Sequence, residues 1–294
     1  MLWAVFTILA AAAQTLRNAL QRDLTARLGV TGATHVRFLF GFPFALLFLA
    51  GMVLLTGETV PPVTPAVLPP VILAALAQIG ATALMLAAMK TKSFVVATAY
   101  TKTEPVLVAL FGLIVLGDAL SPAMAAAIAI ATFGVMLTAW PERRGEGWSL
   151  PALGLGLLSA ALFAIAAIGF RAGIRALPSG GFGIRASTIL ALGLFVQSAG
   201  LTLWLGLTDR PALRAILALW RPSLFAGFMG AAASQLWFLG FALTSAAKVR
   251  TLALVEVFFA RIISGKMFRE APSRREGLGL ALIVLGVALL LNSG

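Results

Sequence analysis

The sequence contains no cysteine, one histidine and ten acidic residues among its 294 positions. Without cysteine there are no disulfide bonds, thiolate metal sites or cysteine nucleophiles. One histidine cannot build a histidine-based metal site, and the sequence has no Walker loop, HExxH or GxSxG motif. We therefore predict no cofactor, no metal and no catalytic residue. The energy for any active transport must come from a gradient of solute, proton or ion.

Charged residues of either sign are also scarce. They make up 11% of the chain, whereas 61% is apolar and the mean hydropathy is +1.02. A soluble globular domain carries roughly 25% charged residues, and a membrane-crossing helix needs about 20 mostly apolar residues. The composition therefore predicts an all-α integral membrane protein. Arg17 is the first basic residue and follows the first apolar run, so we interpret that run as a retained span.

Apolar runs separated by short polar or Pro/Gly-rich breaks predict ten transmembrane helices. No break is long enough to hold a soluble domain, so we expect a single membrane domain. The predicted spans cover residues 2–21, 34–56, 67–89, 93–116, 122–140, 150–174, 182–207, 222–244, 247–267 and 276–292.

The two halves of the chain resemble each other, which favours an internal duplication. An odd number of spans per repeat inserts the repeats in opposite orientations, with a pseudo-two-fold axis in the membrane plane and a cavity between them. We predict two inverted five-helix repeats, residues 1–145 and 146–294, that meet near the PERRGEG segment at 141–147. The matched positions are Glu104 with Glu256, Asp118 with Glu270, Gly134-Val135 with Gly286-Val287 and, after small shifts, Arg17 with Arg171 and Arg37 with Arg185.

Basic residues are unevenly divided between the two sets of loops. Loops after odd-numbered spans hold thirteen Lys and Arg residues, and loops after even-numbered spans hold five. The positive-inside rule then places both termini outside a bacterial inner (plasma) membrane. Anionic lipid headgroups explain the net charge of +12, and nucleic acid is not an expected partner because no basic patch is interleaved with aromatics.

A repeated signature lies near the fourth span of each half. In the first half it consists of Glu104-Pro105, Gly117-Asp118 and Gly134-Val135, and an Arg opens the second span of each half. This pattern resembles the drug/metabolite transporter superfamily in its EamA-like ten-helix branch. The second copy departs from it, since Val257 replaces the proline and Glu270 follows an arginine. That departure puts any function of a paired helix break in doubt there.

The resemblance implies a basket of ten helices, alternating access and small polar metabolites such as amino acids. It also implies termini in the cytoplasm, opposite to the charge count, and we keep the charge count because the 57–66 loop has no basic residue. The resemblance does not identify the cargo.

Two carboxylates stand out because ionisable groups inside spans cost about 2.5–3.5 kcal/mol each on insertion scales. Glu104 and Glu256 both lie deep in their predicted spans. They are candidate coupling or gating groups that could exchange protons. The alternative is a structural carboxylate that caps a broken helix or pairs with an Arg. Pro105 favours a helix break beside Glu104.

Several polar side chains are candidates for binding a solute. Gln14 and Arg17 lie on one face of the first span with Asn18 and Gln21. Arg17 could instead extend to the headgroups, and the amides could simply join helices. The same two accounts apply to Gln78, Gln235 and Trp237.

Buried cations outnumber buried carboxylates in the predicted spans. We expect this excess to favour a carboxylate-bearing or anionic solute, since Arg grips such groups in bidentate fashion. The alternative is that the cations neutralise the two glutamates and helix ends. Tyr100 could stack on an apolar moiety or pack structurally. The cationic candidates are Arg37, Lys102, Arg185, Arg250 and Arg261.

The sequence as a whole predicts a secondary transporter, not an enzyme, in which two halves rock around a polar cavity. A lipid-headgroup or drug exporter of the same fold is the alternative, and an intramembrane enzyme acting on a lipid-linked substrate is the alternative from another class. Ten spans suffice for a complete pathway, so we expect a monomer.

Overall fold

The structure is a computed structural model that describes residues 1–91, 100–138, 150–259 and 274–292. Within these ranges the regular structure is entirely helical. Six helical stretches are long and apolar enough to cross a membrane, and two shorter apolar helices accompany them. The all-α architecture is confirmed within these ranges, and the count of ten spans stays a prediction. Parts of the predicted fourth and ninth spans, the 141–147 segment, Arg261 and Glu270 lie outside the described residues.

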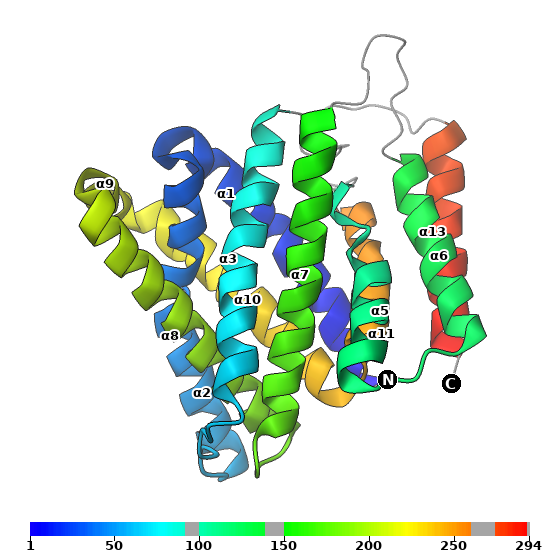
Figure 1. Cartoon of the computed structure of the whole chain (residues 1–294), viewed down its shortest axis with the longest axis horizontal. Helices are drawn as coiled ribbons and strands as arrows, with labels where there is room; N and C mark the ends of the chain where they lie inside the picture. Colours follow the sequence, from blue (N-terminus) through cyan, green and yellow to red (C-terminus); the bar gives the residue numbers. More distant parts are fainter. Residues whose placement is uncertain (92–99, 139–149, 260–273, 293–294) are drawn as a thin grey trace.

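Eleven α-helices and one 3₁₀ turn are assigned within the described ranges (Figure 1). They are α1 (Leu2–Leu39), α2 (Phe42–Thr56), α3 (Leu68–Thr91), α5 (Glu104–Leu116), α6 (Pro122–Thr138), α7 (Leu150–Ala176), α8 (Phe182–Thr208), α9 (Arg210–Ala218), α10 (Trp220–Leu243), α11 (Ala246–Leu252), η1 (Ala253–Val255) and α13 (Arg274–Asn292).

The first two predicted spans meet in an unexpected way. Residues 22–33 were predicted to be a loop, but they are helical on both sides of Gly29. At Gly29 the chain leaves helical geometry and α1 reverses direction (Figure 1). Gly29 has φ 70° and ψ 179°, a conformation that only glycine adopts without strain. The second predicted span is therefore built from the end of α1 and from α2, with a turn at Phe40 and Gly41 between them.

Helices from the two halves of the chain pack against each other. α1 packs along α10, α3 along α7 and α6 along α13, while α2 lies beside α8 and α5 beside α11. Gly134 and Gly279 bring α6 and α13 close together, because a Cβ at Gly134 would lie 2.7 Å from the Gly279 carbonyl oxygen. Small residues give membrane helices this kind of close contact.

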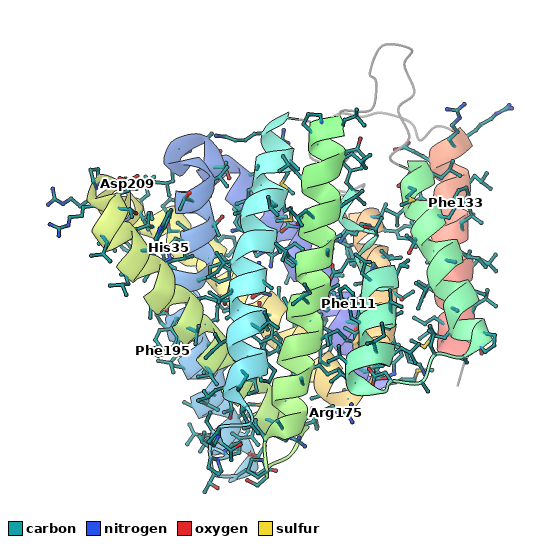
Figure 2. The ribbon with its side chains drawn as sticks, viewed as in Figure 1. His35, Phe111, Phe133, Arg175, Phe195 and Asp209 are labelled. Atoms are coloured by element: carbon teal, nitrogen blue, oxygen red, sulfur yellow. The ribbon has the colours of Figure 1, made fainter. Side chains whose placement is uncertain are left out.

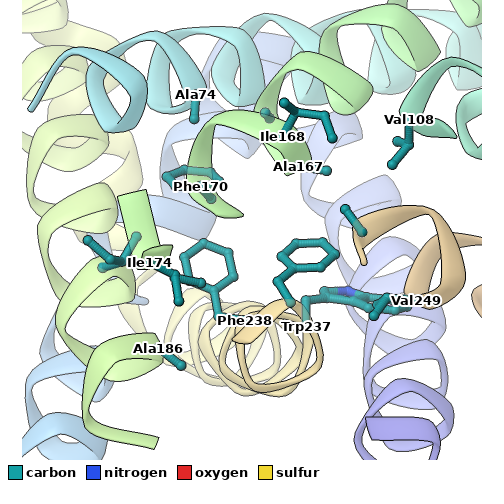
Figure 3. Packing of buried hydrophobic residues seen from close by; sticks show 14 of the residues in the cluster. Ala74, Val108, Ala167, Ile168, Phe170, Ile174, Ala186, Trp237, Phe238 and Val249 are labelled. Atoms are coloured by element: carbon teal, nitrogen blue, oxygen red, sulfur yellow. The ribbon is translucent and has the colours of Figure 1, made fainter. Parts of the chain in front are cut away.

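The largest core cluster lies where several of these helices converge. Figure 3 shows Phe170 of α7 near Phe238 of α10, with ring centroids 4.7 Å apart. Ala74 of α3 and Val249 of α11 belong to the same cluster. Many leucines and phenylalanines on the outer surface remain exposed, as expected for side chains that face lipid.

Candidate functional site

A buried ion pair joins the two halves of the chain. Lys102 Nζ lies 2.6 Å from Glu256 Oε2, and both side chains are almost fully buried. Lys102 belongs to the first half and Glu256 to the second.

Two side chains of α1 complete the hydrogen bonding of Glu256. Gln14 Nε2 donates to Oε2 at 3.0 Å, and Asn18 Nδ2 donates to Oε1 at 3.3 Å. Trp237 Nε1 in turn donates to Gln14 Oε1 at 3.0 Å. Both carboxylate oxygens are therefore occupied, which is what a buried charge requires.

A second ion pair mirrors the first. Arg250 Nε lies 3.0 Å from Glu104 Oε1, again with one partner from each half. The two atoms are close but not aligned as a hydrogen bond, so each is left without a hydrogen-bond partner. The Arg250 guanidinium also stacks on Trp237, 4.6 Å from the ring centroid. Glu104 Oε1 is thus held by charge and proximity, whereas both oxygens of Glu256 accept hydrogen bonds.

Interruptions of the helix place both carboxylates. Residues 102 and 103 form a turn, and α5 begins at Glu104 with Pro105 in its first turn. The helix break that Pro105 predicted is confirmed. In the second half, the 3₁₀ turn η1 ends immediately before Glu256. The chain therefore departs from α-helical hydrogen bonding next to Glu256 although proline is missing there.

Arg17 and Arg37 lie next to these pairs. A Cβ on Gly230 of α10 would lie 3.5 Å from Arg17 Cδ and 3.1 Å from Arg37 Cγ, so both side chains pass the same point of α10. Arg17 donates to Asn18 Oδ1, and Arg37 donates to Thr82 Oγ1. We call the following set the central cluster: Gln14, Arg17, Asn18, Arg37, Lys102, Glu104, Trp237, Arg250 and Glu256.

The remaining candidates lie outside this cluster and bind other groups. Gln78 accepts from Gln197 of α8, and Gln235 donates to Ser187 of α8. Arg185 donates to the carbonyl oxygens of Ile174 and Arg175 at the end of α7. These contacts favour the alternative in which the amides join helices, and they give Arg185 a role at a helix C-terminus.

Tyr100 and His35 also lie apart from the cluster. Tyr100 is buried and packs against Gly156 of α7. His35, labelled in Figure 2, contacts Thr202 of α8 through Nε2 at 3.0 Å. Neither contact contributes to the two ion pairs.

The sequence reasoning missed a clamp at the end of α5. Arg171 of α7 donates to both oxygens of Asp118 at 2.7 and 2.6 Å, and its Nε donates to the Thr244 carbonyl oxygen. Arg175, which is labelled in Figure 2, also approaches this carboxylate. Its Nη1 lies 3.6 Å from Asp118 Oδ1. The clamp joins the ends of α5, α7 and α10. The repeat had matched Asp118 and Arg171 with other residues, but nothing in the pattern indicated that they meet.

We expect Asp118→Asn to weaken this clamp. Asparagine keeps one acceptor oxygen but loses the charge-assisted contact in which Arg171 Nη1 reaches both oxygens. We expect this loss to lower the free energy of unfolding by about 1–3 kcal/mol. Unfolding by denaturing detergent measures the change. The control is Asp23→Asn, which removes the exposed i,i+4 pair with Arg27 and should cost at most about 0.5 kcal/mol. Equal effects of the two variants would contradict a clamp.

Within the described ranges, no group of three or more His, Asp or Glu side chains is placed to hold a metal ion. The chemistry of the central cluster is therefore that of ion pairs, amides and stacked cations.

Comparison with known proteins gives one family and one fold. A model of the EamA-like transporter family matches residues 1–140 and again residues 150–292. No curated protein matches. Among 29 matching chains of solved structures, one titled "Crystal structure of protein" has a TM-score of 0.70 and 18% identity, covering 98% of this chain and 94% of that one. At that identity the likeness supports the fold alone.

Proposed function

Because the chain belongs to the EamA-like transporter family, we propose that it is a secondary active transporter that moves a small polar, anionic solute by alternating access. The family and the apolar helices make it a multi-pass membrane protein of the transporter class. The solute class and the mechanism are the proposal, and the central cluster supports both.

The observation that carries the proposal is the crossing of the two ion pairs. Lys102 of the first half holds Glu256 of the second, and Arg250 of the second holds Glu104 of the first. Any rocking of one half against the other must loosen these contacts. Breaking a buried pair without replacement is costly, so a charged solute that enters the cluster can offset that cost.

The helix pairing supports two inverted five-helix repeats, residues 1–145 and 146–294. If α1 corresponds to α7 and α3 to α10, exchanging the halves converts the α1–α10 contact into the α7–α3 contact. The contacts α2–α8 and α6–α13 then map onto themselves. A two-fold axis between the halves has this property, and the family model matches each half separately.

We place the edge that carries the N-terminus and the end of α13 outside a bacterial inner membrane (Figure 1). The opposite edge carries the Gly29 turn and α9, and the basic residues Arg22, Arg27, Lys90, Arg210 and Arg214 belong to the segments there. The positive-inside rule supports this orientation. The Asp118–Arg171 clamp then closes the outer end. We expect a monomer to suffice.

Counterflow into proteoliposomes tests the function. Purified protein is reconstituted with an internal unlabelled solute, and entry of labelled amino acids, organic acids and phosphorylated metabolites is followed with and without a pH gradient. Saturable, protein-dependent exchange of an anionic solute supports the proposal. If folded protein moves no solute in the panel, a transport function of this kind is wrong.

Glu104→Gln is expected to remove the response of transport to an imposed pH gradient. Glu104 Oε1, the oxygen nearest Arg250, accepts no hydrogen bond within the described ranges. Glu104 is therefore the group we assign to proton exchange, and an amide does not exchange protons. Initial counterflow rates are measured over a range of pH for this variant and for Asp23→Asn, which changes an exposed carboxylate. If the Glu104→Gln variant keeps the pH dependence of the unaltered protein, Glu104 is not the proton-coupling group. The proposed transport function would still stand.

A further inference from the structure

Two buried arginines in the central cluster form no ion pair with a carboxylate among the described residues. Arg17 is 1% exposed and Arg37 is 2% exposed. Across the part of the chain that the structure describes, neither lies within 4.0 Å of a carboxylate, although all five ion pairs there involve other Lys or Arg residues. Arg17 Nη1 and Arg37 Nε also have no hydrogen-bond partner.

Neutral groups hold these two arginines side by side. Asn18 Oδ1 accepts from Arg17 Nη2 at 2.6 Å and from its Nε at 3.2 Å. Thr82 Oγ1 accepts from Arg37 Nη1 at 2.9 Å. Asn18 and Thr82 orient the guanidinium groups without neutralising them, and Gly230 of α10 leaves room for both stems. Two like charges are therefore fixed close together inside the protein.

The charges of the central cluster do not balance. Its described members comprise four cations, Arg17, Arg37, Lys102 and Arg250, and two carboxylates, Glu104 and Glu256. The two cross-half pairs account for one cation and one carboxylate each. Two positive charges remain in a region where each unpaired charge costs several kcal/mol. Buried cations of this kind need anions.

We propose that Arg17 and Arg37 form a subsite for a solute that carries two negative charges, such as a dicarboxylate or a phosphomonoester. This inference rests on the proposed transport function and specifies its solute. The two free nitrogens, Arg17 Nη1 and Arg37 Nε, supply donors for the anionic oxygens. Binding a dianion makes the cluster neutral, whereas a monoanion or a zwitterion leaves it charged.

A matched series of probes separates charge from shape. Succinate, succinamate and succinamide share one carbon skeleton and carry two, one and no negative charges. Methyl phosphate and dimethyl phosphate make the corresponding pair for phosphate. Each probe is tested for raising the melting temperature of the protein in nanodiscs and for competing with counterflow. We expect succinate or methyl phosphate to bind about 10- to 100-fold more tightly than its less charged analogues.

Replacing either arginine is expected to reverse the preference for dianions over monoanions. With Arg37→Gln one positive charge is left, so the monoanion should bind better than the dianion, and Arg17→Gln should behave alike. Because the reversed order requires binding by a folded protein, unfolding cannot imitate it. The matched control is Arg27→Gln, which alters an exposed arginine and should keep the preference for dianions.

The outcomes distinguish this inference from the function on which it rests. Transport of neutral or zwitterionic solutes with no binding of either dianion would overturn the subsite and leave the transporter standing. Equal binding of succinate and succinamide, or an unchanged preference in both arginine variants, would also overturn it. Movement of no solute at all would overturn the transport function. Which dianion binds, succinate or methyl phosphate, separates a dicarboxylate site from a phosphomonoester site.

Discussion

Replacing Glu256 with alanine is expected to abolish transport and to lower the free energy of unfolding by about 3–5 kcal/mol. The substitution leaves the Lys102 ammonium buried without its partner at 2.6 Å. It also removes the acceptor for Gln14 and Asn18 of α1. Unfolding in denaturing detergent gives the stability change, and counterflow gives the activity.

The control for this prediction removes both charges together. Lys102→Met combined with Glu256→Gln keeps one acceptor oxygen, for Gln14 or Asn18, and creates no new unpaired ion. Neutral replacement of a buried pair is often tolerated, so the double variant should regain most of the stability while transport stays impaired. If Glu256→Ala unfolds at the same detergent concentration as the unaltered protein, the pair does not join the halves as described.

Gly134→Leu is expected to separate α6 from α13 and to destabilise the protein by at least about 3 kcal/mol, the upper end of ordinary overpacking. A Cβ at this position would lie 2.7 Å from the Gly279 carbonyl oxygen and 2.9 Å from Ile283 N. Both are backbone atoms of α13, so no side-chain rotation relieves the clash. Detergent unfolding of the purified variant measures the loss.

The control for the glycine contact is a helical glycine in open surroundings. Nothing lies within 4 Å of a Cβ built on Gly200 of α8. Alanine at that position should leave stability unchanged or slightly raised, because alanine favours helix over glycine. Similar effects of Gly134→Leu and a Gly200→Ala change would mean that α6 and α13 do not meet as closely as the structure indicates.

Hydropathy predicted most of the helical stretches but not where the chain bends. Apolar runs mark residues that prefer lipid, and α7, α8 and α13 end close to the predicted edges. The stretch at 22–33 looked like a loop because charged residues and glycines interrupt its apolar residues. One face of the helix there is nevertheless buried, with Leu24 and Ala33 in the core. The Gly29 reversal depends on one dihedral angle, which hydropathy does not record.

The candidate site was predictable where one helix face carried the signal. Gln14 and Asn18, one turn apart, both bind Glu256. Gln21 of the same stripe instead donates to the Ala33 carbonyl oxygen across the turn in α1. Arg37 and Arg185 look equivalent in the sequence. Arg185, in the first turn of α8, instead donates to a carbonyl oxygen at the end of α7. Depth within the helix bundle, which no local pattern reports, separates them.

The crossing of the two ion pairs also bears on how the protein is made. Lys102 and Glu104 leave the ribosome long before Arg250 and Glu256, which are their partners. A nascent chain that contains only the first half therefore holds an ammonium and a carboxylate whose neutralising groups have not been synthesised. The early helices are therefore inserted before they reach their final packing. The two ion pairs form only after Arg250 and Glu256 have been synthesised, in the last third of translation.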